Sequence, residues 1–141
     1  MMLDVDLQAT LGDFKIKAAF QADAGITALF GPSGAGKTSL VNMLAGLQRP
    51  SRGRIVVREH VLFDSGEGID LPPEQRRLGY VFQESRLFPH LSVADNLSYG
   101  YALVPKVVAL VDYDAVVDLL ALQSLLTRRP GTLSGGERQR V

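Results

Sequence analysis

The sequence contains no cysteine and no tryptophan among its 141 residues. Without cysteine it has neither a disulfide framework nor a cysteine-ligated zinc or iron–sulfur site. Its 15 basic and 15 acidic residues leave no net charge, which argues against nucleic acid as a partner. The longest apolar run, 107–111, is far shorter than the roughly 20 residues of a membrane-spanning helix. The first residues include early acids, so no secretory signal is expected.

The remaining composition, with 46% apolar residues, is that of an ordinary globular domain with a hydrophobic core. Apolar residues alternate with polar ones over 3–7 and 14–20, on either side of Gly12-Asp13, which predicts a hairpin in an antiparallel sheet. Short strands are predicted at 54–57 and 61–63. The stretch between 64 and 75 carries two Gly and a Pro pair, so we expect a surface loop whose Asp64, Asp70 and Glu74 are solvated.

Two segments, 26–30 and 78–82, are apolar on both faces, which is typical of buried strands in a parallel sheet. The first is followed by a glycine-rich loop and by a predicted helix from Lys37 that ends at Gly46. Further helices are predicted over 93–99 and about 114–123. The order of these elements predicts an α/β fold with a helical insert after Gln83.

The glycine-rich loop fits the pattern G-x-x-x-x-G-K-[ST] from Gly31 to Thr38. Glycines let such a loop turn consecutive N–H groups inward, and the helix that follows adds its free N–H groups and the positive end of its dipole. Lys37 then reaches the β- and γ-phosphates of a nucleotide, and the Thr38 hydroxyl ligates Mg²⁺. The predicted nucleotide-binding residues are Gly31, Pro32, Ser33, Gly34, Ala35, Gly36, Lys37, Thr38 and Ser39.

A second constellation, Leu133-Ser134-Gly135-Gly136-Glu137, follows a helix break at Pro130-Gly131. Two glycines and a serine at a helix start supply N–H donors and a hydroxyl for an anion. Taken alone, the same letters are also an ordinary capping box, with Glu three residues after Ser. The phosphate loop about 100 residues upstream favours the anion-binding interpretation.

Together the two motifs resemble the phosphate loop and signature motif of ATP-binding cassette (ABC) transporter ATPases. The resemblance implies a P-loop NTPase core with an antiparallel β subdomain (1–83, with the P-loop core) and a helical signature subdomain (84–141). It implies ATP and Mg²⁺ as cofactors, with Lys37 stabilising phosphate charge. Gln83 matches the Q-loop glutamine, so it would join Thr38 at the metal and orient the attacking water.

The family's architecture implies the partners. Two copies meet head to tail, and Ser134, Gly135, Gly136 and Glu137 of one copy cap the ATP held by the other. Residues 84–90 would receive a membrane permease, which exposed Leu87 and Phe88 would suit; the alternative is that both pack within the helical subdomain. A periplasmic binding protein would act indirectly. The resemblance places such a subunit at the cytoplasmic face of a bacterial inner membrane.

Where the family stacks adenine on an aromatic residue, this chain has Leu11, with Phe14 nearby. The strand that ends in Asp, the catalytic Glu and the switch His of the family would all lie beyond Val141, so the general base is absent and residues 1–141 are expected to lack ATPase activity alone. His60 and His90 are read as structural or surface residues.

The segments 25–30, 76–83 and 86–90 resemble the ATPase subunits of bacterial molybdate importers, which implies a role in oxyanion uptake. The alternatives are an ABC ATPase for sulfate, ferric iron or a polyamine, and a non-catalytic ATP-binding fragment. A soluble ABC protein of DNA repair or translation would need a coiled-coil insertion or a second cassette, and neither is seen. A small P-loop kinase is disfavoured by the motif at Leu133.

Overall fold

The computed structural model describes residues 2–101, 103 and 112–141, and the apolar run at 107–111 therefore lies outside the described residues. The chain divides into two compact units, Met1–Tyr80 and Val81–Val141. Within the described ranges, no helix combines the length and apolarity needed to cross a bilayer.

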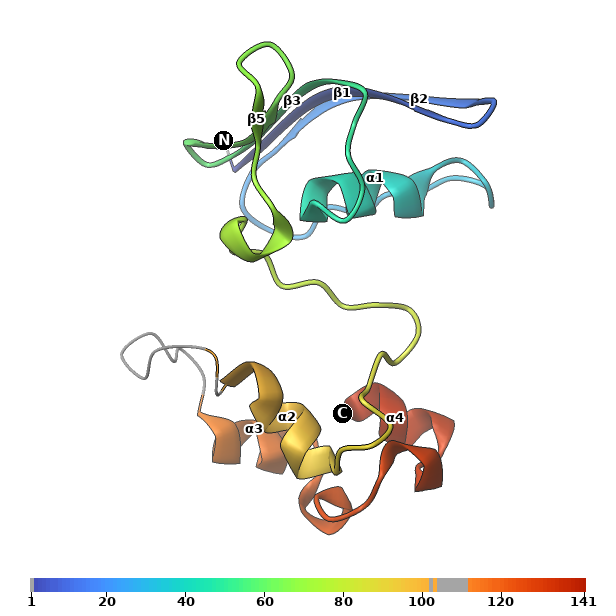
Figure 1. Ribbon diagram of the computed structural model, residues 1–141, viewed down its shortest axis with the longest axis vertical. Helices are drawn as coiled ribbons and strands as arrows, with labels where there is room; N and C mark the ends of the chain where they lie inside the picture. Colours follow the sequence, from blue (N-terminus) through green and yellow to red (C-terminus); the bar gives the residue numbers. More distant parts are fainter. Residues whose placement is uncertain (1, 102, 104–111) are drawn as a thin grey trace. The chain divides into compact units, whose positions relative to one another are not determined.

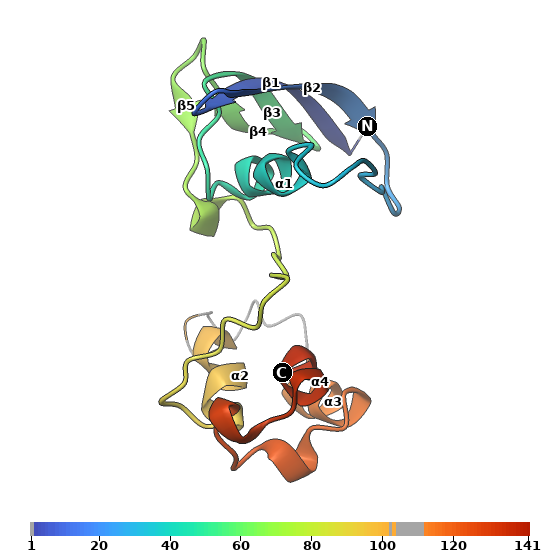
Figure 2. The ribbon, with the colours of Figure 1, turned by 90° about the vertical axis from the view of Figure 1, so that its right-hand side faces the viewer.

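The first unit is built on an antiparallel sheet of five strands in the order β2-β1-β3-β4-β5 (Figures 1 and 2). Its strands are β1 (Leu3–Leu11), β2 (Phe14–Ala22), β3 (Arg52–Val57), β4 (His60–Asp64) and β5 (Ile69–Asp70). Leu11 pairs with Phe14 across the Gly12-Asp13 turn, so the predicted hairpin is confirmed. Strands β3 and β4 also confirm the predicted short strands.

Helix α1 (Lys37–Ala45) covers one face of this sheet (Figure 2). Alternation along β1 turns Val5, Leu7 and Ala9 toward the helix, where they form a core with Leu40, Met43 and residues of the other strands. The predicted stop is confirmed, because Gly46 takes a left-handed conformation after Ala45 and its N–H donates to the Met43 carbonyl at 3.2 Å. The sheet therefore supports the helix that follows the glycine-rich loop.

The strands predicted at 26–30 and 78–82 are wrong for the described structure, where both segments are irregular. Ile26 and Phe30 are fully exposed, as is Val81. A strand needs hydrogen-bonded neighbours, and the sheet pairs only β1 to β5. Apolar composition thus identified segments suited to burial, but within the described residues no strand pairs with either of them.

The expectation of a simple surface loop over 64–75 also needs correction. The segment contains β5 and a 3₁₀ turn, η1 (Pro73–Gln75). Asp64 forms an ion pair with Arg54, and Asp70 forms ion pairs with Arg49 and Arg76, so these two carboxylates are structural rather than merely solvated.

The second unit is helical, as predicted (Figure 1). Its elements are α2 (Val93–Tyr101), α3 (Tyr113–Leu119), η3 (Gln123–Leu125), η4 (Pro130–Thr132) and α4 (Gly135–Arg140). Helix α3 is shorter than the predicted 114–123, because Ala121 adopts a left-handed conformation (φ 51°) that ends it. Val93, Val117, Leu122, Leu125 and Leu133 form a separate core that carries the second motif.

Candidate functional site

The glycine-rich loop of the first unit leads directly into α1. Gly34 (φ 83°) and Gly36 (φ 86°) have left-handed backbones, which glycine adopts without strain. Gly36 is the N-cap of α1, no side chain caps the helix, and its first turn contains no acid. The first N–H groups of the helix and its positive dipole end are therefore not neutralised by a side chain.

Lys37 lies back along this loop. Its ammonium Nζ donates to the carbonyl of Gly31 at 2.7 Å and to that of Pro32 at 2.8 Å. Thr38 is exposed in the first turn of α1, and Ser39, next to it, is half-buried. An ammonium, a hydroxyl and uncapped N–H groups on one loop are the groups that bind an anionic phosphate.

An aromatic ring borders the loop. Phe14, at the start of β2, is 45% exposed. A Cβ atom added to Gly36 would lie 3.2 Å from Phe14 Cε1 and 3.0 Å from Ile16 Cδ1, so both side chains contact the loop where α1 begins. Phe14 thus combines closeness to the loop with a free aromatic surface.

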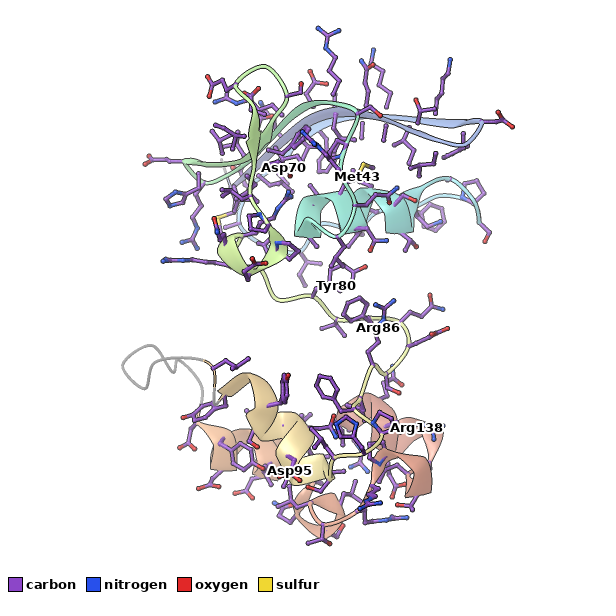
Figure 3. The ribbon with its side chains drawn as sticks, in the orientation of Figure 1. Met43, Asp70, Tyr80, Arg86, Asp95 and Arg138 are labelled. Atoms are coloured by element: carbon purple, nitrogen blue, oxygen red, sulfur yellow. The ribbon has the colours of Figure 1, made fainter. Side chains whose placement is uncertain are left out.

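Gln83 belongs to the second unit, so the structure describes it separately from the phosphate loop. Its side chain is exposed. The guanidinium carbon of Arg86 lies 4.1 Å from the centre of the Phe82 ring, a cation–π contact that folds the chain around Gln83. Figure 3 labels Arg86 in this segment.

The segment that follows Gln83 is fastened to α2. The Phe88 N–H donates to Asn96 Oδ1 at 2.7 Å, and Asn96 Nδ2 donates back to the Phe88 carbonyl at 3.1 Å. The Phe88 ring contacts Tyr99 at a tilt of 43°, with 4.5 Å between ring centres, and contacts His90 edge-on. Leu87 is half-buried and Phe88 is 38% exposed, so the segment is held against α2 while part of its apolar surface stays exposed.

The second motif forms a complete capping box at the start of α4. The Ser134 N–H donates to Glu137 Oε2 at 2.6 Å, and the Glu137 N–H donates to Ser134 Oγ at 3.2 Å. These bonds lower the pKa of the Glu137 carboxyl, chiefly through the Ser134 backbone N–H, with Arg128 and Arg140 acting in the same direction. Gly135 and Gly136 occupy the first two helical positions. The local capping role is thus present, and binding of a nucleotide here stays a prediction.

One residue of the first unit was missed from the sequence: Arg76, whose side chain is buried. Burial lowers the pKa of its guanidinium, while Asp70 acts in the opposite direction. A pair of arginines beside a proline-rich stretch gives no sign of which one is buried. In the part of the chain that the structure describes, no three His, Asp or Glu residues gather as a metal cluster.

Comparison with known proteins places these motifs in a family. A family model described as ABC transporter matches residues 17–141. The chain is 59% identical over 140 residues to the molybdenum import ATP-binding protein ModC of Paramagnetospirillum magneticum, covering 99% of this chain and 39% of that protein. It is 54% identical over 141 residues to ModC of Mesorhizobium japonicum, covering 38% of that protein. The chain thus spans about two-fifths of the length of these relatives.

Solved structures agree on the fold. One is titled as the ATP-binding subunit of an ABC transporter and matches with a TM-score of 0.76 at 23% identity, over 99% of this chain and 59% of that one. Another, a dimeric ATP-binding cassette bound to ADP and Pi, matches with a TM-score of 0.69 at 23% identity, over 99% of this chain and 66% of that one. The family-model match over residues 17–141 shows that the chain belongs to the ABC transporter family.

Proposed function

We propose that this chain is the nucleotide-binding part of an ATPase subunit that drives a bacterial importer, with molybdate as the cargo. The observation that carries the proposal is the phosphate loop, where Lys37 and an uncapped helix start converge on one short segment. The cargo is taken from the relatives named for molybdenum import, at 54–59% identity. No residue of an ATPase subunit needs to contact the cargo itself.

ATP with Mg²⁺ is the ligand that the loop residues fit. The left-handed glycines allow the backbone to turn its N–H groups toward the phosphates, and Lys37 exchanges its carbonyl acceptors for phosphate oxygens. Thr38, exposed in the first turn of α1, would hold the metal through its hydroxyl, and the family resemblance assigns the Gln83 amide as a second ligand. When bound, Mg²⁺ would offset the negative charge of the phosphates.

The remaining residues are assigned to partners. The nucleotide of a second, head-to-tail copy is capped by Ser134, Gly135, Gly136 and Glu137. Gln83 links the bound nucleotide to the segment 84–90 that follows it in the chain. The surface at 84–90, held by Asn96, receives a membrane permease at the cytoplasmic face of the inner membrane. A partly exposed Phe88 supported by Tyr99 suits such a contact, because aromatic residues are enriched in interfaces.

A nucleotide titration tests the proposal. The purified protein is titrated with a fluorescent ATP analogue in the presence of Mg²⁺, beside Lys37→Ala and the control Lys17→Ala on the exposed side of β2. We expect Lys37→Ala to weaken binding at least about tenfold, because it removes charge-assisted hydrogen bonds to phosphate. The control is expected to bind as the unchanged protein does. Equal affinity in all three proteins, or no binding by the unchanged protein, would contradict the proposal.

The cargo needs a test in cells. A strain lacking its own molybdate transporter, and carrying the complete transporter of which this chain is part, is expected to accumulate molybdate at submicromolar supply. Uptake of sulfate, ferric iron or a polyamine in place of molybdate would overturn the cargo assignment. It would leave the nucleotide site untouched.

A further inference from the structure

Arg76 is the one charged side chain that is buried among the residues that the structure describes, with 4% of its surface exposed. Its Nε donates to the Leu71 carbonyl at 2.7 Å, and Nη2 donates to Asp70 Oδ1 at 3.1 Å. Its Nη1 donates to the carbonyls of Met43 at 2.8 Å and Leu44 at 3.0 Å. A buried charge is strongly unfavourable unless such partners surround it, so this arrangement is a specific one.

The two Nη1 bonds hold the end of α1 that lies opposite the phosphate loop. Met43 and Leu44 lie in the last turn, where the helix dipole is negative, and the Met43 carbonyl accepts from Arg76 in addition to the Gly46 N–H. The last turn of α1 contains no basic residue of its own, so Arg76 supplies the cation from 33 positions beyond Met43 and 32 beyond Leu44. Figure 3 labels Met43 on α1 and Asp70 on the neighbouring strand β5, the two sides that Arg76 joins.

Gly46 makes room for this contact. A Cβ atom at Gly46 would lie 2.6 Å from Arg76 Nε, closer than real contacts allow, and 3.0 Å from its guanidinium carbon, a tight contact. The residue that ends α1 and the residue that holds its end are therefore fitted to one another. Any side chain at Gly46 would displace the guanidinium from its carbonyl partners.

Hydrogen bonds restrict the rotation and sliding of α1, which apolar packing alone restricts only weakly. Leu40 and Met43 press α1 onto the sheet, but hydrophobic contact is non-directional and resists small rotation or sliding weakly. Arg76 bonds to two successive carbonyls of the helix, and the Tyr80 hydroxyl donates to Asn42 Oδ1 of the same turn at 2.7 Å. Since α1 has nine residues, at about 1.5 Å each, its two ends lie only about 13 Å apart and move together.

We propose that Arg76 is a positioning residue for the phosphate site, which fixes the axial position and rotation of α1 and thereby of the loop and Lys37 at its other end. This inference rests on the proposed nucleotide-binding function. Arginine is suited to the role because its planar fork serves four acceptors at once, whereas a lysine ammonium has three donors on one atom. The four hydrogen bonds described for Arg76 all go to residues outside the loop, so its effect on binding is indirect.

The test compares Arg76→Lys, Arg76→Gln and Gly46→Ala with Arg77→Lys, a control at the exposed neighbouring arginine. Affinity for Mg-ATP is measured by titration well below the melting temperature of each variant, with the stoichiometry recorded so that a smaller folded fraction is not mistaken for weaker binding. We expect the dissociation constant to rise about tenfold in Arg76→Lys, the lower end of the loss caused by removing a partner that orients a metal ligand. Arg76→Gln is expected to rise further, and Arg77→Lys to stay unchanged.

A second readout separates positioning from simple stabilisation. In ¹H–¹⁵N spectra recorded without nucleotide, the amide signals of Gly34 and Gly36 are expected to shift in Arg76→Lys and Gly46→Ala but not in Arg77→Lys. Lower melting temperatures with affinities within twofold and unshifted loop amides would overturn the inference and make Arg76 only a structural residue. If Arg76→Lys does not fold, Gly46→Ala decides by the same two criteria.

The two proposals fail in different ways. If the unchanged protein binds Mg-ATP and Lys37→Ala does not, while all Arg76 and Gly46 variants bind normally, the positioning role alone is refuted. If the unchanged protein binds no nucleotide, the proposed function fails and this inference fails with it.

Discussion

The most direct physical test of the phosphate loop is the pair Gly34→Ala and Gly36→Ala. Both glycines have nearly the same left-handed backbone, with φ of 83° and 86°. Their surroundings differ, because a Cβ at Gly34 meets no atom within 4 Å, whereas one at Gly36 lies 3.0 Å from Ile16 Cδ1 and 3.2 Å from Ile16 Cγ1. The pair therefore separates the cost of backbone conformation from the cost of crowding.

The expected magnitudes follow from these contacts. An alanine forced into the left-handed region costs about 1–2 kcal/mol, and both variants incur this. Gly36→Ala also crowds Ile16 and Phe14. This crowding costs about 1 kcal/mol, the low end of the usual overpacking cost, because the new contacts are only a few tenths of an ångström shorter than ordinary van der Waals contacts. We expect losses in the free energy of unfolding of about 1–2 kcal/mol for Gly34→Ala and about 2–3 kcal/mol for Gly36→Ala.

Urea titrations followed by circular dichroism measure these differences. The double variant Ile16→Val/Gly36→Ala removes Ile16 Cδ1, the closest atom, so the excess cost of Gly36→Ala is expected to shrink in the Ile16→Val background. Equal losses for Gly34→Ala and Gly36→Ala would refute the reasoning from crowding. So would an excess that persists unchanged when Cδ1 is absent.

Two further predictions concern single side chains. The capping box lowers the pKa of Glu137 in the folded protein, so its stabilisation is present above the unfolded pKa of the carboxyl and is lost as pH falls through the lowered folded value. When melting temperature is measured against pH, we expect it to fall less at acid pH in Glu137→Gln than in the unchanged protein. An equal fall in both proteins would contradict this assignment. Phe14→Ala is expected to weaken binding of ATP but not of inorganic tripolyphosphate, because an exposed ring beside the loop can stack a base and makes no bond to phosphate. Competition titrations with both ligands measure the two affinities. An equal loss of affinity for both would show that Phe14 only supports the loop.

The parts of the fold that were predictable from sequence are those decided by local patterns. Alternation along β1 and β2 and the Gly12-Asp13 turn determine a hairpin between neighbouring strands. Gly46 ends α1 through its own left-handed conformation. The capping box at Ser134 likewise depends on residues only three positions apart.

The features that escaped prediction depend on distant partners. The segment 26–30 has the composition of a buried strand, yet Ile26 and Phe30 are exposed, because composition does not supply the neighbouring strand whose backbone must pair with it. Arg76 is held by carbonyls 32 and 33 positions earlier in the chain. Nothing in its local sequence distinguishes it from Arg77, which is exposed.

The folded-back Lys37 has a thermodynamic consequence for ligand entry. Two of its three ammonium donors already meet neutral carbonyls, at 2.7 and 2.8 Å, so a phosphate that takes these two positions replaces existing hydrogen bonds. The enthalpy gained at these two positions is then only the difference between a charged phosphate oxygen and a neutral carbonyl as the acceptor of an ammonium N–H. In return, the side chain is already ordered and loses little rotamer freedom on binding. Calorimetry should therefore find that Lys37 contributes a modest favourable enthalpy of binding and only a small unfavourable entropy.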